Sequence, residues 1–591
     1  HRTLWITGPP GAGKTTLASS YIQERKLRAL WYQLDEGDGD IASFFHYLGL
    51  SVKALAPRYR KPLPPLTPEY LPGLLTFTRR FFETLSQRLG PPALIVLDDY
   101  HEVAPEAPLH EVVREAAESL PSGLSLLVLS RSDPPASFAR LRLHGELVRF
   151  GWEDLQLTQD EARAIAALHA PQAAEARVAE LHDQAQGWVA GLVLLLEGGV
   201  APAPAASQPG PHTQPLLFDY FALEIFERLG PSRQAALLCT AFLRCITARQ
   251  AERLTGDHKA GRVLADLERR NCFVMKRAAA EAIYEIHPLF RDFLLERANA
   301  AFDEATLVAV QRYAAELLDE AGQPEEAAPL YQAARDWQAL SSLVLRHAPA
   351  LLSAGRHQTL THWLNVLPQA GFTHAPWLRY WQGMARLPFA PVEARGHLEE
   401  AYFRFQEVDD AVGLYLAWAG IMDTFFFEWR DFALMDPWIA EFEWLRARHP
   451  EFPSRAIELR TFSAMGTLAH RQPQHPFLRI WAERTLALLK AADDRHLCIV
   501  LGGYLLMCFL WWGESVKARA VIETVAPWTR TPDIAPMVYL LWSCAVALYH
   551  SVHGGQEACL KLVEDGLALA RKTGLHCWDF HLCAQAARCG L

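Results

Sequence analysis

A glycine-rich loop near the start of the chain has the residue types and spacing of a phosphate-binding loop. Residues 8–16 read GPPGAGKTT, which fits the pattern GxxxxGK[ST] between an apolar run and a helical pattern. Glycines let the backbone wrap around a phosphate, and the amides of a helix N-terminus can point toward it. Lys14 would lie between the β and γ phosphates, and the Thr15 hydroxyl would bind Mg²⁺. We therefore predict an ATP or ADP site made by Gly8, Gly11, Ala12, Gly13, Lys14, Thr15 and Thr16.

Two adjacent carboxylates follow another apolar run and could complete this site. A phosphate loop needs an acidic residue at the end of a neighbouring strand to hold the metal ion. Residues 94–100, LIVLDDY, end such a run in Asp98 and Asp99. We assign Asp98 to Mg²⁺, through water, and Asp99 to polarising the attacking water. The structural alternative is a solvated helix cap.

An arginine follows a third apolar run. Residues 124–130, LSLLVLS, precede Arg131. At the carboxyl end of a parallel strand beside the nucleotide, Arg131 could sense the γ phosphate. The alternative is an ordinary surface arginine.

The elements that must position these residues form an α/β unit. Between residues 2 and 154, five apolar runs of strand length alternate with helical patterns, at 4–7, 29–35, 93–98, 124–130 and 146–150. Continuous apolar strands separated by helices indicate a parallel sheet covered on both faces. The N-terminal unit is therefore predicted to be a P-loop parallel sheet.

The rest of the chain reads as helical, with one exception. Residues 159–196 are rich in Ala, Leu and Glu, residues 200–215 contain five prolines, and residues 272–287 read as a hairpin around Ala279. Helices followed by a small hairpin fit a winged helix. After residue 302, similar apolar segments recur about every forty residues near Gly383, Gly420, Gly466, Gly503 and Cys544, a spacing typical of stacked, TPR-like two-helix repeats.

These patterns divide the chain into six parts. We expect a nucleotide-binding domain at 1–157, a helical lid at 158–199 and a Pro/Ala-rich linker at 200–215. A winged-helix domain at 216–300, a helical arm at 301–370 and sensor repeats at 371–591 follow. The fold class is thus multidomain α/β plus α.

The motifs, in this order, resemble those of the STAND ATPases of the MalT type, which are large LuxR-family transcription regulators. The resemblance rests on eight segments up to about Pro368: ITGPPGAGKTT (6–16), WYQLDEGD (31–38), VLDDYH (96–101), VLSR (128–131), LTQDEA (157–162), GWVAGLVLL (187–195), IHPLFRDFL (286–294) and RHQTLTHWLNVLP (356–368). Beyond it, only the repeat character matches.

This resemblance implies a nucleotide-controlled switch. An ADP-bound closed monomer would bind an inducer on its repeats, exchange ADP for ATP and self-associate, and slow hydrolysis would reset it. His287 matches the histidine that reaches the ADP β phosphate, and Gly187 and Trp188 match a lid motif near the base. The structural alternatives are a histidine that satisfies a helix turn and a tryptophan that fills a core. The family's DNA-binding helix-turn-helix has no matching segment before Leu591, so DNA contact would need a domain outside this fragment.

Composition limits the other functions. The chain has 57 Lys and Arg against 67 Asp and Glu, a net charge of −10, which argues against a large nucleic-acid face. Its ten cysteines form no CxxC pair, as expected in the cytoplasm. The chain begins at His1 without a signal peptide, as a cut fragment would. The longest apolar run, residues 496–512, falls short of the ~20 residues of a membrane helix, and we expect no membrane association.

Several alternatives remain open. The tryptophans of the repeats could line an inducer pocket or fill the spaces between helices: Trp377, Trp381, Trp418, Trp429, Trp438, Trp511 and Trp512. The acidic run at 35–38 could contact ribose or a partner protomer, or be a solvated loop. At the level of the protein, the rivals are a STAND protein with a different effector, a P-loop enzyme that phosphorylates a small molecule, and a scaffold whose nucleotide is only structural.

Overall fold

The computed structural model describes most of the chain. It covers residues 2–59, 61–198, 226–227, 229–269, 273–277, 282–368, 372, 375–489, 495–530 and 534–590. The proline-rich segment expected at 200–215 lies outside these residues.

The N-terminal unit is a five-stranded parallel sheet in the order β2-β3-β4-β1-β5. The predicted apolar runs form its strands: β1 (Thr3–Thr7), β2 (Arg28–Gln33), β3 (Ala93–Asp98), β4 (Leu124–Ser130) and β5 (Leu147–Phe150). Because the strands are parallel, their carboxyl ends lie along one edge of the sheet. This edge brings the ends of β1, β3 and β4 together, as the predicted site requires.

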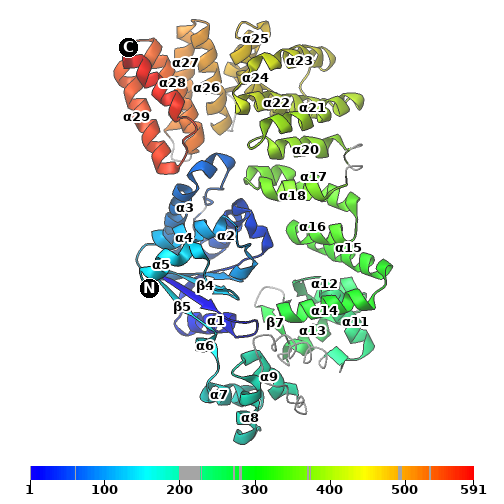
Figure 1. Ribbon diagram of the computed structural model, residues 1–591. Coiled ribbons are helices and arrows are strands. Elements are labelled where there is room, and N and C mark those ends of the chain that lie inside the picture. The colour runs from blue at the N-terminus through cyan, green and yellow to red at the C-terminus, as the bar shows by residue number, and fades with distance from the viewer. Residues whose placement is uncertain are drawn as a thin grey trace.

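Both faces of the sheet are covered, which explains the unbroken apolar runs. Ile95 and Leu97 of β3 pack toward α2 (Ile41–Leu55), α3 (Leu74–Leu89) and α4 (Leu109–Ser119). Leu94 and Val96 point the other way, into a cluster with Ala18 of α1 (Lys14–Glu24). Figure 1 shows these helices on the two sides of the sheet.

A second, smaller sheet follows a group of short helices. The chain passes through α6 (Trp152–Leu155), α7 (Gln159–His169), α8 (Glu175–Ala185) and α9 (Val189–Gly198). It then forms α11 (Pro231–Thr240), β6 (Cys245–Thr247), α12 (Ala248–Thr255), α13 (Ala260–Arg269), β7 (Val274–Arg277), β8 (Ile283–Ile286) and α14 (Pro288–Ala301). The predicted hairpin is β7–β8, and β6 pairs with β8 on the other side.

From residue 304 onward, the described chain is helical. Four helices lead away from the small sheet: α15 (Glu304–Glu320), α16 (Pro324–Ala333), α17 (Trp337–Ser353) and α18 (His357–Val366). The recurring apolar segments become α20 (Pro376–Arg386), α22 (Ala411–Glu428), α24 (Arg455–Arg471), α26 (Arg495–Trp511) and α28 (Pro536–Val552). Between and after them lie α21 (Pro391–Glu407), α23 (Asp436–Arg448), α25 (Pro476–Leu489), α27 (Ser515–Thr529), α29 (Gln556–Thr573) and α30 (Asp579–Gly590). We call α20–α30 the helical array.

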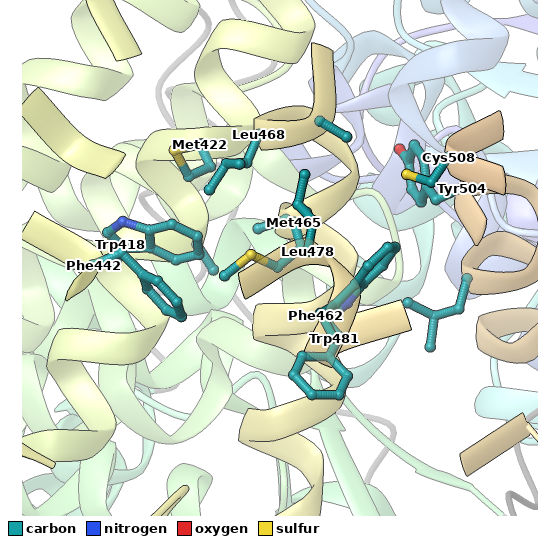
Figure 2. Packing of buried hydrophobic residues seen from close by; sticks show 14 of the residues in the cluster. Trp418, Met422, Phe442, Phe462, Met465, Leu468, Leu478, Trp481, Tyr504 and Cys508 are labelled. Atoms are coloured by element: carbon teal, nitrogen blue, oxygen red, sulfur yellow. The ribbon is translucent and has the colours of Figure 1, made fainter. Parts of the chain in front are cut away.

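Large side chains fill the spaces between the helices of the array (Figure 2). The Trp418 and Phe442 rings lie 4.3 Å apart, and Trp418 donates a hydrogen bond to the Trp438 carbonyl at 2.9 Å. Of the seven tryptophans considered above, Trp429 and Trp511 are exposed, at 45% and 44%. The other five are buried or packed against this core, as stacking between helices predicts.

The array curves back and touches the N-terminal unit (Figure 1). Leu540, Leu575 and Leu582 of its last part belong to the same apolar cluster as Phe77 of α3. At Gly73, just before α3, an added Cβ would lie 2.3 Å from the carbonyl oxygen of Gly574. The two backbones are therefore in direct contact.

Polar contacts also join the helices that follow the small sheet to the N-terminal unit. Thr359 of α18 donates to the Asp40 carboxylate at 2.8 Å, at the start of α2. The buried Arg356 side chain donates to Ser43 at 2.8 Å and to Glu325 at 2.6 Å. Helices α16 and α18 are thus tied to the N-terminal unit.

No helix within the described stretches is long and apolar enough to span a bilayer. The run at 496–512 lies largely in α26, whose side chains are mostly buried among other helices of the array.

Candidate nucleotide site

The glycine-rich loop joins β1 to α1 in the conformation that its glycines allow. Gly11 and Gly13 have positive φ of 71° and 81°, and α1 begins at Lys14 directly afterwards. Non-glycine residues avoid such values. A Cβ on Gly11 would lie 2.7 Å from the Ala190 Cβ. Glycine is therefore required both by the turn and by the neighbour.

Lys14 lies folded against this loop. Its ammonium group donates to the carbonyls of Gly8 at 2.8 Å and Pro9 at 3.1 Å. Burial, and then the charge of Arg131, lower the pKa of Lys14 to about 8. An anion placed at the loop would favour the charged ammonium.

Thr15 and Asp98 lie together, although 83 residues separate them in the chain. The Thr15 hydroxyl is 3.2 Å from one Asp98 carboxylate oxygen and 3.5 Å from the other. Burial, and then the neighbouring Asp99, raise the pKa of Asp98 to about 6. A hydroxyl beside a buried carboxylate is an oxygen donor set that fits Mg²⁺, and a cation would stabilise the ionised carboxylate.

Asp99 occupies a constrained position at the end of β3. Its φ is 55°, in the left-handed region, and its amide donates to the Asp98 carboxylate at 2.9 Å. Gln33 at the end of β2 donates to the Asp99 carboxylate at 2.8 Å. Arg244, from the unit with the small sheet, lies 3.8 Å from the same oxygen.

Arg131 and His287 complete the group. The charge of Arg131 acts on the pKa values of Lys14 and His287, so the three side chains share one region. His287 is the N-cap residue of α14, and its amide donates to the Phe273 carbonyl at 2.7 Å. Burial, and then Arg131, lower the pKa of His287 to about 4. The imidazole is therefore neutral at pH 7.

The start of α9 holds the loop from the other side. Trp188 is buried, and its indole nitrogen donates to the Pro10 carbonyl at 2.9 Å. The Ala190 amide donates to the Gly11 carbonyl at 3.1 Å. The Gly187–Trp188 motif thus contacts the backbone of the phosphate loop itself.

The acidic run at 35–38 is exposed at residues 35–37 and buried at Asp38. Asp35 caps a short 3₁₀ helix, and Asp38 is buried and accepts a hydrogen bond from the Tyr32 hydroxyl at 2.6 Å. For Asp38, the interpretation as a solvated loop is wrong, because the side chain serves a local turn.

Three residues of the site were not anticipated from the sequence. Gln33 ends a strand whose register places it opposite Asp98, and the rule of parallel strand ends could have identified it. His101 lies beside Glu102, and burial, and then Arg131, lower its pKa to about 4. Arg244 comes from a different unit, and no local pattern marks it.

Comparisons with known proteins agree with this arrangement. A family model described as the MalT winged helix domain matches residues 222–306, which confirms the winged-helix interpretation of the small sheet. A model described as Nephrocystin 3, N-terminal, matches residues 1–131.

Relatives and one solved structure extend the match. The chain is 28% identical over 416 residues to the HTH-type transcriptional regulator MalT of Yersinia pestis (strain Pestoides F), covering 69% of this chain and 45% of that protein. Identity to the MalT of Serratia proteamaculans (strain 568) is 27% over 419 residues, covering 69% and 46%. The chain spans less than half the length of these relatives.

The fold is similar to the crystal structure of a Signal Transduction ATPase with Numerous Domains (STAND) that has a tetratricopeptide repeat sensor, from Pyrococcus horikoshii. The TM-score is 0.61 at 13% identity, over 99% of this chain and 83% of that chain. Sequence and fold comparisons therefore agree: the chain is similar in sequence to MalT regulators and in fold to a STAND protein with a tetratricopeptide repeat sensor.

Proposed function

We propose that residues 1–591 are the nucleotide-controlled switch of a cytoplasmic, MalT-like transcription regulator. ADP would hold a closed monomer, and an inducer bound to the helical array would allow ATP to replace ADP and the protein to self-associate. Slow hydrolysis would reset the switch. Similarity to HTH-type transcriptional regulators supports a transcriptional output, and we assign DNA contact to a domain outside these residues.

The roles follow the predicted division of the chain. Residues 1–157 would bind nucleotide, 158–199 would act as a lid, and the linker at 200–215 would lead to the winged-helix domain at 216–300. The arm at 301–370 would connect these to the sensor at 371–591.

One observation carries the proposal: the winged-helix unit reaches the residues that would bind and hydrolyse the nucleotide. Arg244 lies 3.8 Å from Asp99, and His287 lies where the charges of Arg131, Asp99 and Lys14 act on it. Movement of this unit would therefore change the site, and a change at the site would bias the unit.

The chemistry that we assign to each residue follows from its position. Lys14 would exchange its bonds to the loop carbonyls for bonds to phosphate oxygens, and Thr15 and Asp98 would hold Mg²⁺, which neutralises phosphate charge. Asp99 would orient the attacking water, and Arg131 would contact the γ phosphate. Neutral His287 could donate one hydrogen bond to a phosphate of ADP.

A small-molecule phosphotransferase is less well supported. Such an enzyme must admit an acceptor beside Asp99, where Arg244 of the winged-helix unit lies. A scaffold that binds its nucleotide only for structure would not need Asp99, the carboxylate that Gln33 holds in place.

Nucleotide content tests the proposal. The purified chain, denatured in acid and resolved by ion-exchange chromatography, should release about one ADP or ATP per chain. Lys14→Ala should weaken nucleotide binding roughly ten- to hundred-fold, since a charged hydrogen bond contributes about 1.5–3 kcal/mol. Lys53→Ala, at an exposed lysine of α2, is the matched control. A wild-type chain that neither retains nor takes up nucleotide would overturn the proposal.

A further inference from the structure

Asp99 is held by two side chains that come from different units. Gln33 belongs to the same sheet and donates to Asp99 at 2.8 Å. Arg244 belongs to the winged-helix unit, and its guanidinium lies 3.8 Å from the same carboxylate. The two side chains of this ion pair are 31% and 26% exposed, so water screens the pair only in part.

The backbone fixes Arg244 firmly within the winged-helix unit. Its neighbours Leu243 and Ile246 are completely buried, and the Arg291 side chain of α14 donates to the Ala241 carbonyl at 2.8 Å. The backbone of Arg244 therefore moves with the winged-helix unit.

Arg244 also leaves its sheet at the same end as His287. Strands β6 and β8 are antiparallel, with Cys245 opposite Glu285. Arg244 precedes β6 and His287 follows β8, so the two residues emerge side by side toward the nucleotide site. Any motion that withdraws one of them withdraws the other.

Charges from three parts of the chain meet at Arg244. Burial raises the pKa values of Glu102 and Glu326, and the positive charge of Arg244 opposes both shifts. Glu102 follows β3 of the N-terminal unit, and Glu326 lies in α16. Arg244 thus lies at the junction of sheet, winged helix and arm, which an opening of the structure must separate.

Building on the proposed function, we propose that Arg244 is a clamp on Asp99: in the closed arrangement it pairs with this carboxylate, and withdrawal of the winged-helix unit frees Asp99 to orient the attacking water. While the guanidinium lies against this Asp99 oxygen, the oxygen is not free to accept a hydrogen bond from the attacking water. Gln33 stays with the sheet and keeps Asp99 in position. The capacity to hydrolyse ATP then depends on the position of the winged-helix unit.

Single-turnover hydrolysis of ATP with Mg²⁺ tests the clamp, using the nucleotide-free full chain loaded with ATP without an inducer, so that the winged-helix unit stays in the closed arrangement. Arg244→Gln should raise the rate roughly two- to five-fold, the factor expected for a partly exposed ion pair. Arg244→Lys, which keeps the charge, should restore most of the restraint. Arg253→Gln is the matched control, because Arg253 of the winged-helix unit also forms an ion pair outside that unit, with Glu320 at 2.8 Å. This variant should hydrolyse ATP at the wild-type rate.

Replacing Gln33 should change the hydrolysis rate in the opposite direction. Gln33→Met should slow hydrolysis, because Asp99 loses the partner that positions it. A folded Arg244→Gln protein, with unchanged melting temperature, that hydrolyses at or below the wild-type rate would overturn the clamp.

A double-mutant cycle shows whether Arg244 acts through Asp99. The readout is dissociation of a fluorescent ADP, which Asp99→Asn leaves measurable. Arg244→Gln should accelerate dissociation two- to five-fold alone and have little effect in the Asp99→Asn background. Equal effects in both backgrounds would mean that Arg244 acts through Glu102 or Glu326 and not through Asp99, which would reject the clamp. Wild-type protein that binds no ADP would instead reject the proposed function itself.

Discussion

At the residue scale, the site is a meeting of strand ends. Lys14 follows β1, Asp98 ends β3 and Arg131 follows β4, and parallel pairing brings them to one edge. Sequence motifs were sufficient to predict that these residues lie at this edge, and their roles toward a nucleotide stay predictions. Arg244 could not be predicted, since only the packing of two separate units places it against Asp99.

Mutations of the two adjacent carboxylates should have different effects on nucleotide binding and hydrolysis. Asp98→Asn removes the charge beside the Thr15 hydroxyl and should abolish the Mg²⁺ dependence of nucleotide binding. Asp99→Asn should leave binding nearly intact and reduce single-turnover hydrolysis about a hundred-fold or more, the usual scale for a general base. Titrations of a fluorescent nucleotide with and without Mg²⁺, followed by quench-flow hydrolysis, measure both. If the two variants behaved alike, the assigned roles would be incorrect.

At the scale of helices and strands, the pattern of apolar residues predicted the elements that are long and buried. All five strands of the large sheet were predicted to within two residues at each end, because strands buried on both faces are continuously apolar. Strand β6 was missed, since three residues give no periodicity. The helices of the array were found from their repeating apolar faces.

The contact between α9 and the phosphate loop leads to a prediction for Gly11. In Gly11→Ala, the new Cβ would meet Ala190 at 2.7 Å and the Trp188 indole nitrogen at 3.0 Å, at a φ of 71°. We expect a loss of about 1–2 kcal/mol in the free energy of unfolding, and ADP dissociation that is several-fold faster because α9 is displaced. Gly39→Ala has nothing within 4 Å of the new Cβ and is the control. Denaturant unfolding and stopped-flow ADP release would check both effects, and wild-type values for Gly11→Ala would refute the contact.

At the scale of the whole molecule, the chain closes on itself. The array returns to α3, and the polar contacts of Asp40 and Arg356 tie α18 to α2. Repeat spacing predicts a stack of helices, but not where its last helices lie, because that depends on the accumulated curvature and on surfaces about 500 residues apart in the chain.

Closure should depend on the two glycines where the array meets the N-terminal unit. Gly73→Ala would place a Cβ 2.3 Å from the Gly574 carbonyl oxygen, so the two backbones must separate. We expect a larger radius of gyration by small-angle X-ray scattering and an unchanged fold by circular dichroism. Gly396→Ala, in an open position of α21, should scatter like the wild type. An unchanged radius for Gly73→Ala would show that this contact does not hold the array in place.

If the winged-helix unit responds to the bound nucleotide, the rate of ADP release depends on His287. Fluorescent ADP should leave the His287→Ala protein roughly ten-fold faster than the wild type, because a buried hydrogen bond contributes about 1–2 kcal/mol. His347→Ala, at a histidine of α17, should release ADP at the wild-type rate. Equal rates for wild type and His287→Ala would contradict a winged-helix unit that responds to the bound nucleotide.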